Sequence, residues 1–391
     1  MASRGLTAVP LTTTLVRGAA ELERTEHGVV PHRLPAWARA QCADPQLAMA
    51  ESQPSGVHLA FRTAATVIEL DLRRSRTTYI GIPARPDGVI ELVIDGAVVA
   101  HATTTGGTTV TIDMSTGAAA TEADPASTTR FADLSDAMKD VEIWLPHNET
   151  IELLELRSNA SVEPGPAHPR PEWMHHGSSI SHGSNATRPT GIWPVVAARL
   201  ADVQLVNLGF GGSALLDPFI ARTIRDSPAD IISLKLGINL VNTDLMRLRA
   251  LGPAVHGFLD TIRDGHPTTP LLVVSPIFCA IHEDTPGPAA FDLGAFAHGT
   301  LRFRAAGDPA ERAAGKLTLT VIRDELARIV TQRQATDPHL HYLDGQRLYG
   351  EIDAEAHPLP DALHPDAATH QLMGERFARS VLRAEPLSWA P

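Results

Sequence analysis

The sequence predicts a two-part α/β protein, in which an antiparallel β-sandwich precedes a parallel sheet covered by helices on both faces. Three observations lead to this fold class. The chain has 391 residues, more than one ordinary core requires. Roughly its first 160 residues alternate polar and apolar side chains with a period of two, and the remainder alternates strands with amphipathic helices.

Short alternating segments rich in β-branched residues fill the first part, with Gly, Pro and Asp clustered between them. Half-buried strands joined by turns have this pattern, and many such strands without a long helix favour a sandwich. Trp144 alternates with Ile143 and Leu145, and aromatic residues make up only 5% of the chain, which argues against an open sugar-binding platform. We therefore expect the sandwich to form a wall of a pocket. The predicted strands are 57–61, 67–72, 89–94, 109–112, 141–145 and 151–156.

A proline-rich run over residues 162–171 separates two predicted domains, 1–161 and 172–391, because proline disfavours regular helix and stiffens the chain. In the second domain, apolar faces predict helices over 253–263, with Pro253 in the first turn, over 321–330, and after Asp366. The Gly-, Pro- and Ala-rich residues 280–316 interrupt this rhythm and are expected to form a lid or pocket wall. The predicted strands are 172–176, 203–208, 231–236, 271–275 and 340–343.

Composition and charge exclude several classes of function. The formal net charge of −12 argues against binding to nucleic acid or to an anionic membrane surface, both of which favour basic proteins. Two cysteines, Cys42 and Cys279, have no metal-ligand spacing and are expected to be buried free thiols. Residues 1–28 hold no continuous apolar run before a cleavage site, and no apolar run is long enough to span a bilayer, so the expected location is cytoplasmic.

Four turns carry residues whose types and order suggest a shared chemical role. Ser179 lies in Gly177-Ser-Ser-Ile-Ser181, Gly212 in 207–213, Asn239 in 237–239, and Asp361 and His364 precede the last helix. Each turn alone has an ordinary structural explanation: a Ser-rich turn, a βα turn, an Asn in a turn, a capping Asp. Together, in this order and at the carboxyl ends of predicted parallel strands, they indicate a nucleophile, oxyanion donors and a His base oriented by Asp.

These motifs resemble those of the SGNH or GDSL hydrolase family over residues 172–385. The resemblance makes Ser179, Asp361 and His364 the catalytic triad, and makes the Ser179 N–H, the Gly212 N–H and the Asn239 side chain the oxyanion hole. Ser178 and Leu240 depart from the family pattern, which has Asp at both positions, without touching these roles. The sandwich resembles the carbohydrate-binding-module-like domain of two-domain actinobacterial members.

The resemblance implies acyl transfer through an acyl-serine. The expected reaction is O-acyl transfer, for example of a salicylyl group from its CoA thioester to a hydroxyl of an extended polyketide such as a tetracycline intermediate. The expected partners are a small-molecule acyl donor and a hydroxylated acceptor, with acyl-CoA as co-substrate and no cofactor. One alternative is a carboxylic or carbohydrate esterase; the other is a catalytically silent binding protein, which the complete set of site residues disfavours.

Other polar residues have less specific roles. His175, His176 and His182 surround the nucleophile turn but lack zinc spacing, so they are expected to line a pocket or to hydrogen-bond at the strand end, with no metal. His282-Glu-Asp284 opens the insertion and is expected to be a solvated loop.

Overall fold

The computed structural model describes residues 5–113, 115–165 and 170–383. They fall into two compact units, Met1–Ala36 with Glu51–Arg170 and Thr187–Thr190, and Trp37–Ala50 with Pro171–Ala186 and Gly191–Pro391. The short segment 37–50, which the sequence analysis included in the first domain, thus belongs to the second unit. Of the predicted linker 162–171, residues 166–169 lie outside the described residues.

The first unit contains two β-sheets. One has the strand order β10-β9-β6-β13-β4-β3, with β1 on β13 and β11 on β6; the other has the order β14-β5-β12-β7-β8, with β2 on β5. The pairs are antiparallel except β6 with β9, which run parallel. The strands are β1 Thr7–Val9, β2 Val16–Arg17, β3 Glu21–Arg24, β4 Val29–His32, β5 His58–Thr63, β6 Ile68–Tyr79, β7 Val89–Ile94, β8 Ala97–Thr103, β9 Thr108–Ile112, β10 Ala119–Ala123, β11 Ser127–Phe131, β12 Lys139–Trp144, β13 Thr150–Ser158 and β14 Val162–Pro164.

Alternate side chains of both sheets meet in one apolar core, as expected for a sandwich. Leu59 of β5, Leu70 of β6 and Ile143 of β12 are fully buried members of this core. Trp144 points to the opposite face of its strand, where its ring stacks on His58 with centroids 4.1 Å apart and its Nε1 donates to Glu142. The predicted alternation at residues 143–145 therefore places the tryptophan outside the sandwich core.

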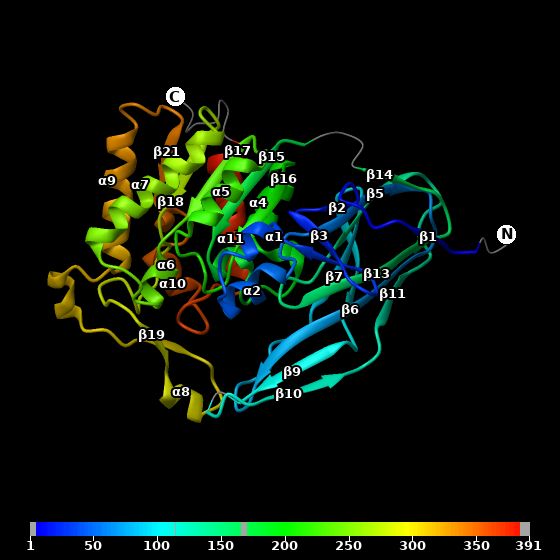
Figure 1. Cartoon of the computed structure of the whole chain (residues 1–391), viewed down its shortest axis with the longest axis horizontal. Helices are drawn as coiled ribbons and strands as arrows, with labels where there is room; N and C mark the ends of the chain where they lie inside the picture. The colour runs from blue at the N-terminus through cyan, green and yellow to red at the C-terminus, as the bar shows by residue number, and fades with distance from the viewer. Residues whose placement is uncertain (1–4, 114, 166–169, 384–391) are drawn as a thin grey trace. The chain divides into compact units, whose positions relative to one another are not determined.

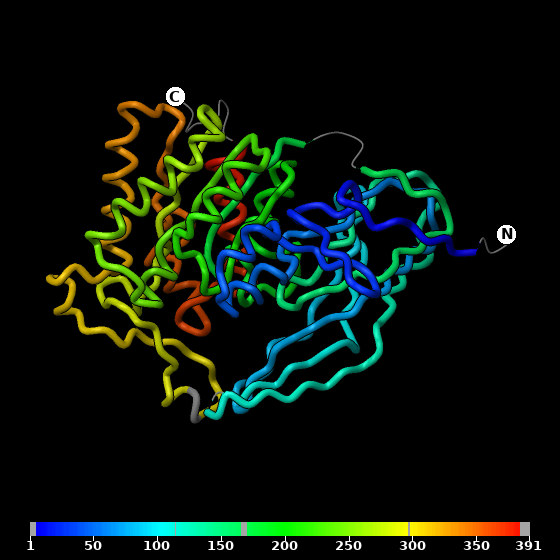
Figure 2. The backbone as a smooth tube through the Cα atoms, viewed as in Figure 1, coloured from blue at the N-terminus to red at the C-terminus, as the bar shows by residue number. Residues whose placement is uncertain are grey.

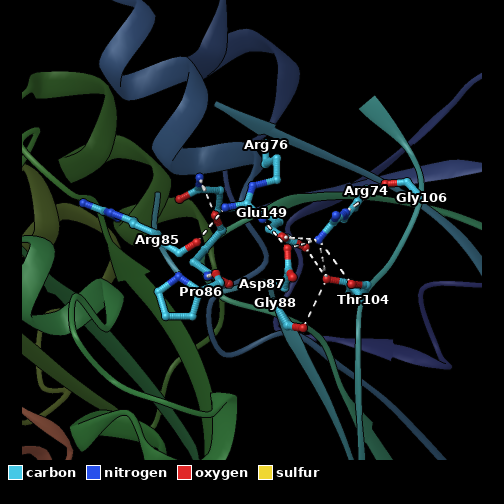
Figure 3. A network of polar contacts seen from close by, with 11 residues as sticks. Arg74, Arg76, Arg85, Pro86, Asp87, Gly88, Thr104, Gly106 and Glu149 are labelled. Carbon is cyan, nitrogen blue, oxygen red and sulfur yellow. Dashed lines mark hydrogen bonds and ion pairs between the residues drawn. The ribbon is translucent and has the colours of Figure 1, made fainter. Parts of the chain in front are cut away.

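A polar network holds neighbouring turns of the first unit together (Figure 3). The Arg74 guanidinium donates to Glu149 at 3.1 Å, to Asp87 at 2.6 Å and to the Gly106 carbonyl oxygen at 2.9 Å. The hydroxyl of Thr104 donates to the second oxygen of Glu149 at 2.6 Å. Glu149 is only 1% exposed, and these donors compensate the cost of burying its charge.

The second unit is built on a five-stranded parallel sheet with the order β16-β15-β17-β18-β21 (Figure 1). Trp173 and His175 of β15 face Trp193 of α4, whereas His176 of the same strand faces Phe258 of α7. Helices therefore cover both faces, as predicted. The strands are β15 Glu172–Gly177, β16 Gln204–Gly209, β17 Ile231–Lys235, β18 Leu271–Val274 and β21 Leu340–Leu343.

Helices connect the successive strands of this sheet. They are α3 Ser179–His182, α4 Trp193–Ala201, α5 Pro218–Asp226, α6 Ile238–Asn242, α7 Leu248–Gly265, α9 Leu319–Arg333, α10 Glu351–Ala356 and α11 Ala367–Phe377, while α1 Ala36–Arg39 and α2 Pro45–Ser52 lie where the chain passes between the units. The placement of Pro253 in the first turn of its helix is wrong, because α7 begins five residues earlier and includes this proline. No helix among the described residues is long and apolar enough to cross a membrane.

The insertion over residues 280–316 has secondary structure of its own. Strands β19 Ala289–Phe291 and β20 Phe303–Ala305 form a two-stranded antiparallel pair, and helix α8 Leu293–Ala297 lies in their connection, yellow in Figure 2. Phe291 and Phe303 are cross-strand partners with ring centroids 5.3 Å apart.

Both cysteines are free; Cys279 is buried, but Cys42 is only half-buried, so its predicted burial is wrong.

The sandwich core gives a direct test of this packing. Leu70→Ala removes a fully buried side chain and leaves a cavity, which is expected to lower the free energy of unfolding of the first unit by about 2–5 kcal/mol. Val99→Ala, at a position 52% exposed, is the matched control and is expected to change it by less than about 0.5 kcal/mol. Urea titrations followed by circular dichroism measure both. Equal effects of the two substitutions would contradict the assignment of Leu70 to the core.

Candidate active site

The nucleophile turn begins where β15 ends. Ser178 caps the short helix α3, with its Oγ accepting from the Ile180 N–H, and Ser179 is the first residue of that helix. A side chain at Gly177 would place its Cβ only 2.4 Å from the Ser181 Oγ, so this position requires glycine. The sharp passage from strand to helix leaves the Ser179 hydroxyl at the carboxyl end of the central sheet, where ligands bind in such folds.

The structure brings Ser179, His364 and Asp361 into one chain of hydrogen bonds. The Ser179 Oγ lies 3.0 Å from the His364 Nε2, and the His364 Nδ1 lies 2.7 Å from the Asp361 Oδ2. All three residues are 8% exposed. In this arrangement the imidazole can accept the serine proton while the carboxylate holds the opposite ring nitrogen in its protonated form.

The Asp361 carboxylate is held in its ionised form by the loop that carries it. Its Oδ1 accepts the N–H groups of Leu363 at 2.9 Å and of His364 at 2.7 Å. Burial acts to raise the pKa of this carboxyl, but the hydrogen bonds and charge of His364 and the N–H of Leu363 outweigh it, so the pKa lies below its usual value. Ala362 adopts a φ of 66°, which bends the loop so that its two N–H groups can reach the carboxylate.

Two residues that sequence reasoning missed also support this loop. The Phe303 N–H donates to the Asp361 carbonyl oxygen at 2.8 Å, and the Phe303 ring stands edge-to-face with the His364 ring at 5.6 Å. Burial raises the pKa of the Cys279 thiol to about 12, and its S–H donates to the Ala362 carbonyl oxygen at 3.4 Å. Neither residue belongs to a motif, so no sequence signal marked them.

The two predicted oxyanion turns are joined to each other. The Asn239 Oδ1 accepts the Ala214 N–H at 3.1 Å, which ties α6 to the turn after β16. Gly212 has a φ of 75°, a conformation that favours glycine. A Cβ at Gly211 would lie 3.8 Å from the Ser179 Cβ, so this turn lies beside the serine.

Buried histidines lie beneath the nucleophile turn. The His175 ring bridges the Ser181 Oγ at 2.8 Å and the Ser233 Oγ at 2.7 Å, and the His176 Nδ1 donates to the Leu208 carbonyl oxygen at 2.8 Å. Burial lowers the pKa of both rings, that of His176 to about 4, and that of His175 well below its usual value. Both residues are therefore neutral structural groups at the strand end, which agrees with one of the two predicted roles, and neither is exposed enough to line a pocket.

Of the insertion's first polar residues, His282 and Glu283 are not solvated, contrary to expectation, whereas Asp284 is exposed as expected. His282 is fully buried, and Glu283 forms a two-pronged ion pair with Arg323 at 2.7 Å.

His182 accepts the Gly211 N–H at its Nδ1, at 3.3 Å. Within the described part of the chain, no three His, Cys, Asp or Glu side chains are grouped so that they could hold a metal ion.

Comparisons with known proteins find similar sequences and folds. Residues 173–282 match the model of the GDSL-like Lipase/Acylhydrolase family. A solved salicylyl-acyltransferase from a tetracycline biosynthetic pathway is 26% identical with a TM-score of 0.77, and the match covers 97% of each chain. No curated protein matches the sequence.

Two other solved structures share the fold at lower identity. A protein from Bacteroides ovatus described as a GDSL-like lipase is 18% identical with a TM-score of 0.65, over 95% of this chain and 96% of that one. A family two carbohydrate esterase from Clostridium thermocellum is 13% identical with a TM-score of 0.56, over 86% and 94%.

The buried histidines of the second unit predict sensitivity to acid. Burial lowers the pKa values of His176 and His370 from 6.5 to about 4, only partly opposed by hydrogen bonds to the Leu208 and Ser184 carbonyl oxygens. Unfolded chains bind protons on histidine near pH 6.5, whereas these folded sites do not, so the free energy of unfolding falls as the pH drops from about 6.5 to about 4.

Urea midpoints measured between pH 7 and pH 5 test this expectation. The midpoint of the second unit should fall continuously over the range, and His176→Gln should reduce the slope because it removes one of the titrating groups. A pH-independent midpoint, or an unchanged slope in the variant, would contradict the prediction.

Proposed function

We propose that the protein, an enzyme of the serine-hydrolase type whose residues 173–282 match the GDSL-like Lipase/Acylhydrolase family, transfers acyl groups through an acyl-serine on Ser179. The observation that carries the proposal is the hydrogen-bonded chain from the Ser179 Oγ through His364 to Asp361, at 3.0 and 2.7 Å. This is the arrangement that makes a weakly nucleophilic hydroxyl reactive at neutral pH.

In the first half-reaction the Ser179 Oγ attacks the acyl carbonyl carbon while its proton passes to the His364 Nε2. Asp361 compensates the positive charge that forms on the ring. As the tetrahedral intermediate collapses, the bond from the carbonyl carbon to the leaving alcohol or thiol breaks, and His364 protonates that group. The acyl-serine remains, and no metal or organic cofactor is needed, although acyl-CoA can serve as the donor.

The negative charge on the carbonyl oxygen needs donors that are already in place. We assign these to the Ser179 N–H, the Gly212 N–H and the Asn239 amide. The hydrogen bond between Asn239 and Ala214 supports this assignment, since it occupies the amide oxygen and fixes the orientation of the amide group. Donors of this kind each contribute on the order of 10²–10³ in kcat.

The second half-reaction distinguishes two candidate activities. In an O-acyltransferase, a hydroxyl of the acceptor attacks the acyl-serine and gives its proton to His364; in an esterase, water does so. In both, the bond from the carbonyl carbon to the Ser179 Oγ then breaks, and His364 returns the proton to that oxygen, which restores the free serine. Acyl transfer is supported by the salicylyl-acyltransferase, which is similar over 97% of both chains. Ester hydrolysis remains the second candidate because the family matched over 173–282 includes acylhydrolases.

The surroundings of His364 favour an aromatic acyl group. Phe303 is half-buried against the His364 ring and pairs with Phe291, which is 38% exposed. Flat rings pack well on such surfaces. We therefore propose an aromatic acyl donor such as salicylyl-CoA, and as acceptor a hydroxylated polyketide of the tetracycline type.

For the sandwich we propose a carbohydrate-binding-module-like architecture without a sugar-binding role of its own. Its aromatic candidate for sugar stacking, Trp144, is only 3% exposed and already stacks on His58.

The role of Ser179 is tested by turnover of salicylyl-CoA and of a p-nitrophenyl ester, with and without a polyhydroxylated aromatic acceptor. Ser179→Ala is expected to lower kcat/KM by at least about 10⁴-fold because it removes the atom that carries the acyl group. Ser227→Ala, at the end of α5, is the matched control and should retain activity.

The products decide between the two activities. Acylated acceptor formed only by protein with an intact Ser179 supports the transferase. Free acid released at one rate regardless of acceptor identifies an esterase, and full activity of Ser179→Ala would overturn the acyl-serine mechanism.

The role of Phe303 is tested by the choice between acyl groups. Phe303→Ala is expected to lower kcat/KM for a salicylyl or benzoyl ester about tenfold more than for an acetyl ester, because only the aromatic group packs on this surface. Ile352→Ala, at a position 84% exposed, serves as a surface control. An equal loss for both esters would limit Phe303 to supporting the His364 loop.

A further inference from the structure

The segment 37–50 belongs to the second unit and contacts its helix α5. At its start, the Arg222 guanidinium of α5 lies 5.4 Å from the centre of the Trp37 ring and donates to the Gln41 Oε1. At its end, Leu47 and Ala50 are buried. Asp44 stabilises the first turn of α2 by accepting the Leu47 N–H at 2.8 Å.

Gln46, in the first turn of α2, reaches the turn that carries Gly212. Its Nε2 donates to the Gly211 carbonyl oxygen at 2.8 Å. A Cβ at Gly212 would lie 3.2 Å from the Gln46 Cγ, so the glutamine side chain also lies along the backbone of this turn. No motif of the sequence marks Gln46, which precedes the nucleophile by more than a hundred residues.

The peptide bond between Gly211 and Gly212 is the one whose N–H is assigned to the oxyanion. In a trans peptide the C=O and the N–H point in opposite directions, so fixing one fixes the other. Two adjacent glycines leave this peptide unusually free to rotate. The peptide group between Phe210 and Gly211 is held because the Gly211 N–H donates to the His182 Nδ1 at 3.3 Å. Gln46 holds the following peptide group, between Gly211 and Gly212, by donating to its carbonyl oxygen.

We infer that Gln46 is a positioning residue for the oxyanion-binding turn, an inference that rests on the function proposed above. By donating to the Gly211 carbonyl oxygen, Gln46 keeps the Gly212 N–H directed away from α2. The same hydrogen bond polarises the amide and strengthens its N–H as a donor, as in other chains of hydrogen bonds. The benefit appears when charge develops on the substrate oxygen, so it affects the transition state more than the bound substrate.

Three variants test this inference in the full-length protein. Gln46→Met keeps the length of the side chain without the N–H donor, and Gln46→Glu places an acceptor against the carbonyl oxygen. Gln41→Met is the matched control, since Gln41 lies in the same segment but contacts Arg222 rather than the turn, and the contact between Arg222 and the Trp37 ring still holds the segment in this variant. Gln46 is exposed, so its replacement removes no core packing and the variants are expected to fold.

The expected result is a loss confined to the chemical step. For a p-nitrophenyl ester, kcat of acylation should fall about three- to tenfold in Gln46→Met and further in Gln46→Glu, with KM unchanged within twofold. Affinity for phenylboronic acid, which forms a tetrahedral adduct with the active serine, should fall by the same factor. Gln41→Met should match wild type in both measurements.

Several outcomes would overturn the inference. The first is an unchanged kcat and boronate affinity in both Gln46 variants. The second is a rise in KM alone, which would place Gln46 on the substrate. The third is a loss of kcat and boronate affinity in Gln41→Met equal to that in the Gln46 variants. Failure of the proposed function itself is recognised separately, because Ser179→Ala would then retain activity and boronate binding.

Discussion

The hydrogen bond between the Ser179 Oγ and the His364 Nε2 joins residues 185 positions apart, and the second unit is arranged so that it can form. In a parallel sheet all strands end on one edge, so turns that are distant in the sequence meet there. Ser179 follows β15, Asn239 follows β17, and the His364 loop precedes α11. Gly177 allows the sharp turn that places the serine. The Asp361 carboxylate, which N–H groups of its own loop keep ionised, orients the histidine. The backbone of these turns therefore determines where the reacting side chains lie.

Burying polar groups beneath this site has a cost that the structure offsets with hydrogen bonds. His175 is fully buried, yet both ring nitrogens have a serine hydroxyl within 2.8 Å. Asn207 donates to the Ser181 carbonyl oxygen at 2.9 Å and accepts the Gly209 N–H at 3.0 Å. Such a satisfied network fixes one arrangement of the nucleophile turn, because each alternative would leave a buried donor or acceptor without a partner. Its neutrality also keeps a second positive charge away from the imidazole that must accept a proton.

The sequence predicted what local patterns encode. The five parallel strands were located to within about two residues, because apolar runs bounded by turn residues are a local signal. The burial of His282 was missed because it depends on contacts with distant segments. The edge strands β8 and β10 were missed because exposure on most of their residues removes the alternation. Pro253 was misplaced since proline often begins a helix, although here the helix accommodates it in its interior. The roles assigned to Ser179 and His364 remain predictions from motifs, with a geometry that suits them.

The support residues explain why motifs alone describe such a site incompletely. A motif lists the atoms that react, whereas rate depends on how narrowly those atoms are held. Phe303 and Gln46 each act on backbone of the site, the first through the Asp361 carbonyl oxygen and the second through that of Gly211. Residues of many types can contact a backbone carbonyl oxygen, so such contacts produce no motif that a single sequence would reveal. Both residues also come from segments added to the α/β core, an insertion and an N-terminal stretch. Because those segments can change without disturbing the sheet, they are where one acyl-serine chemistry can be adapted to water or to an alcohol acceptor.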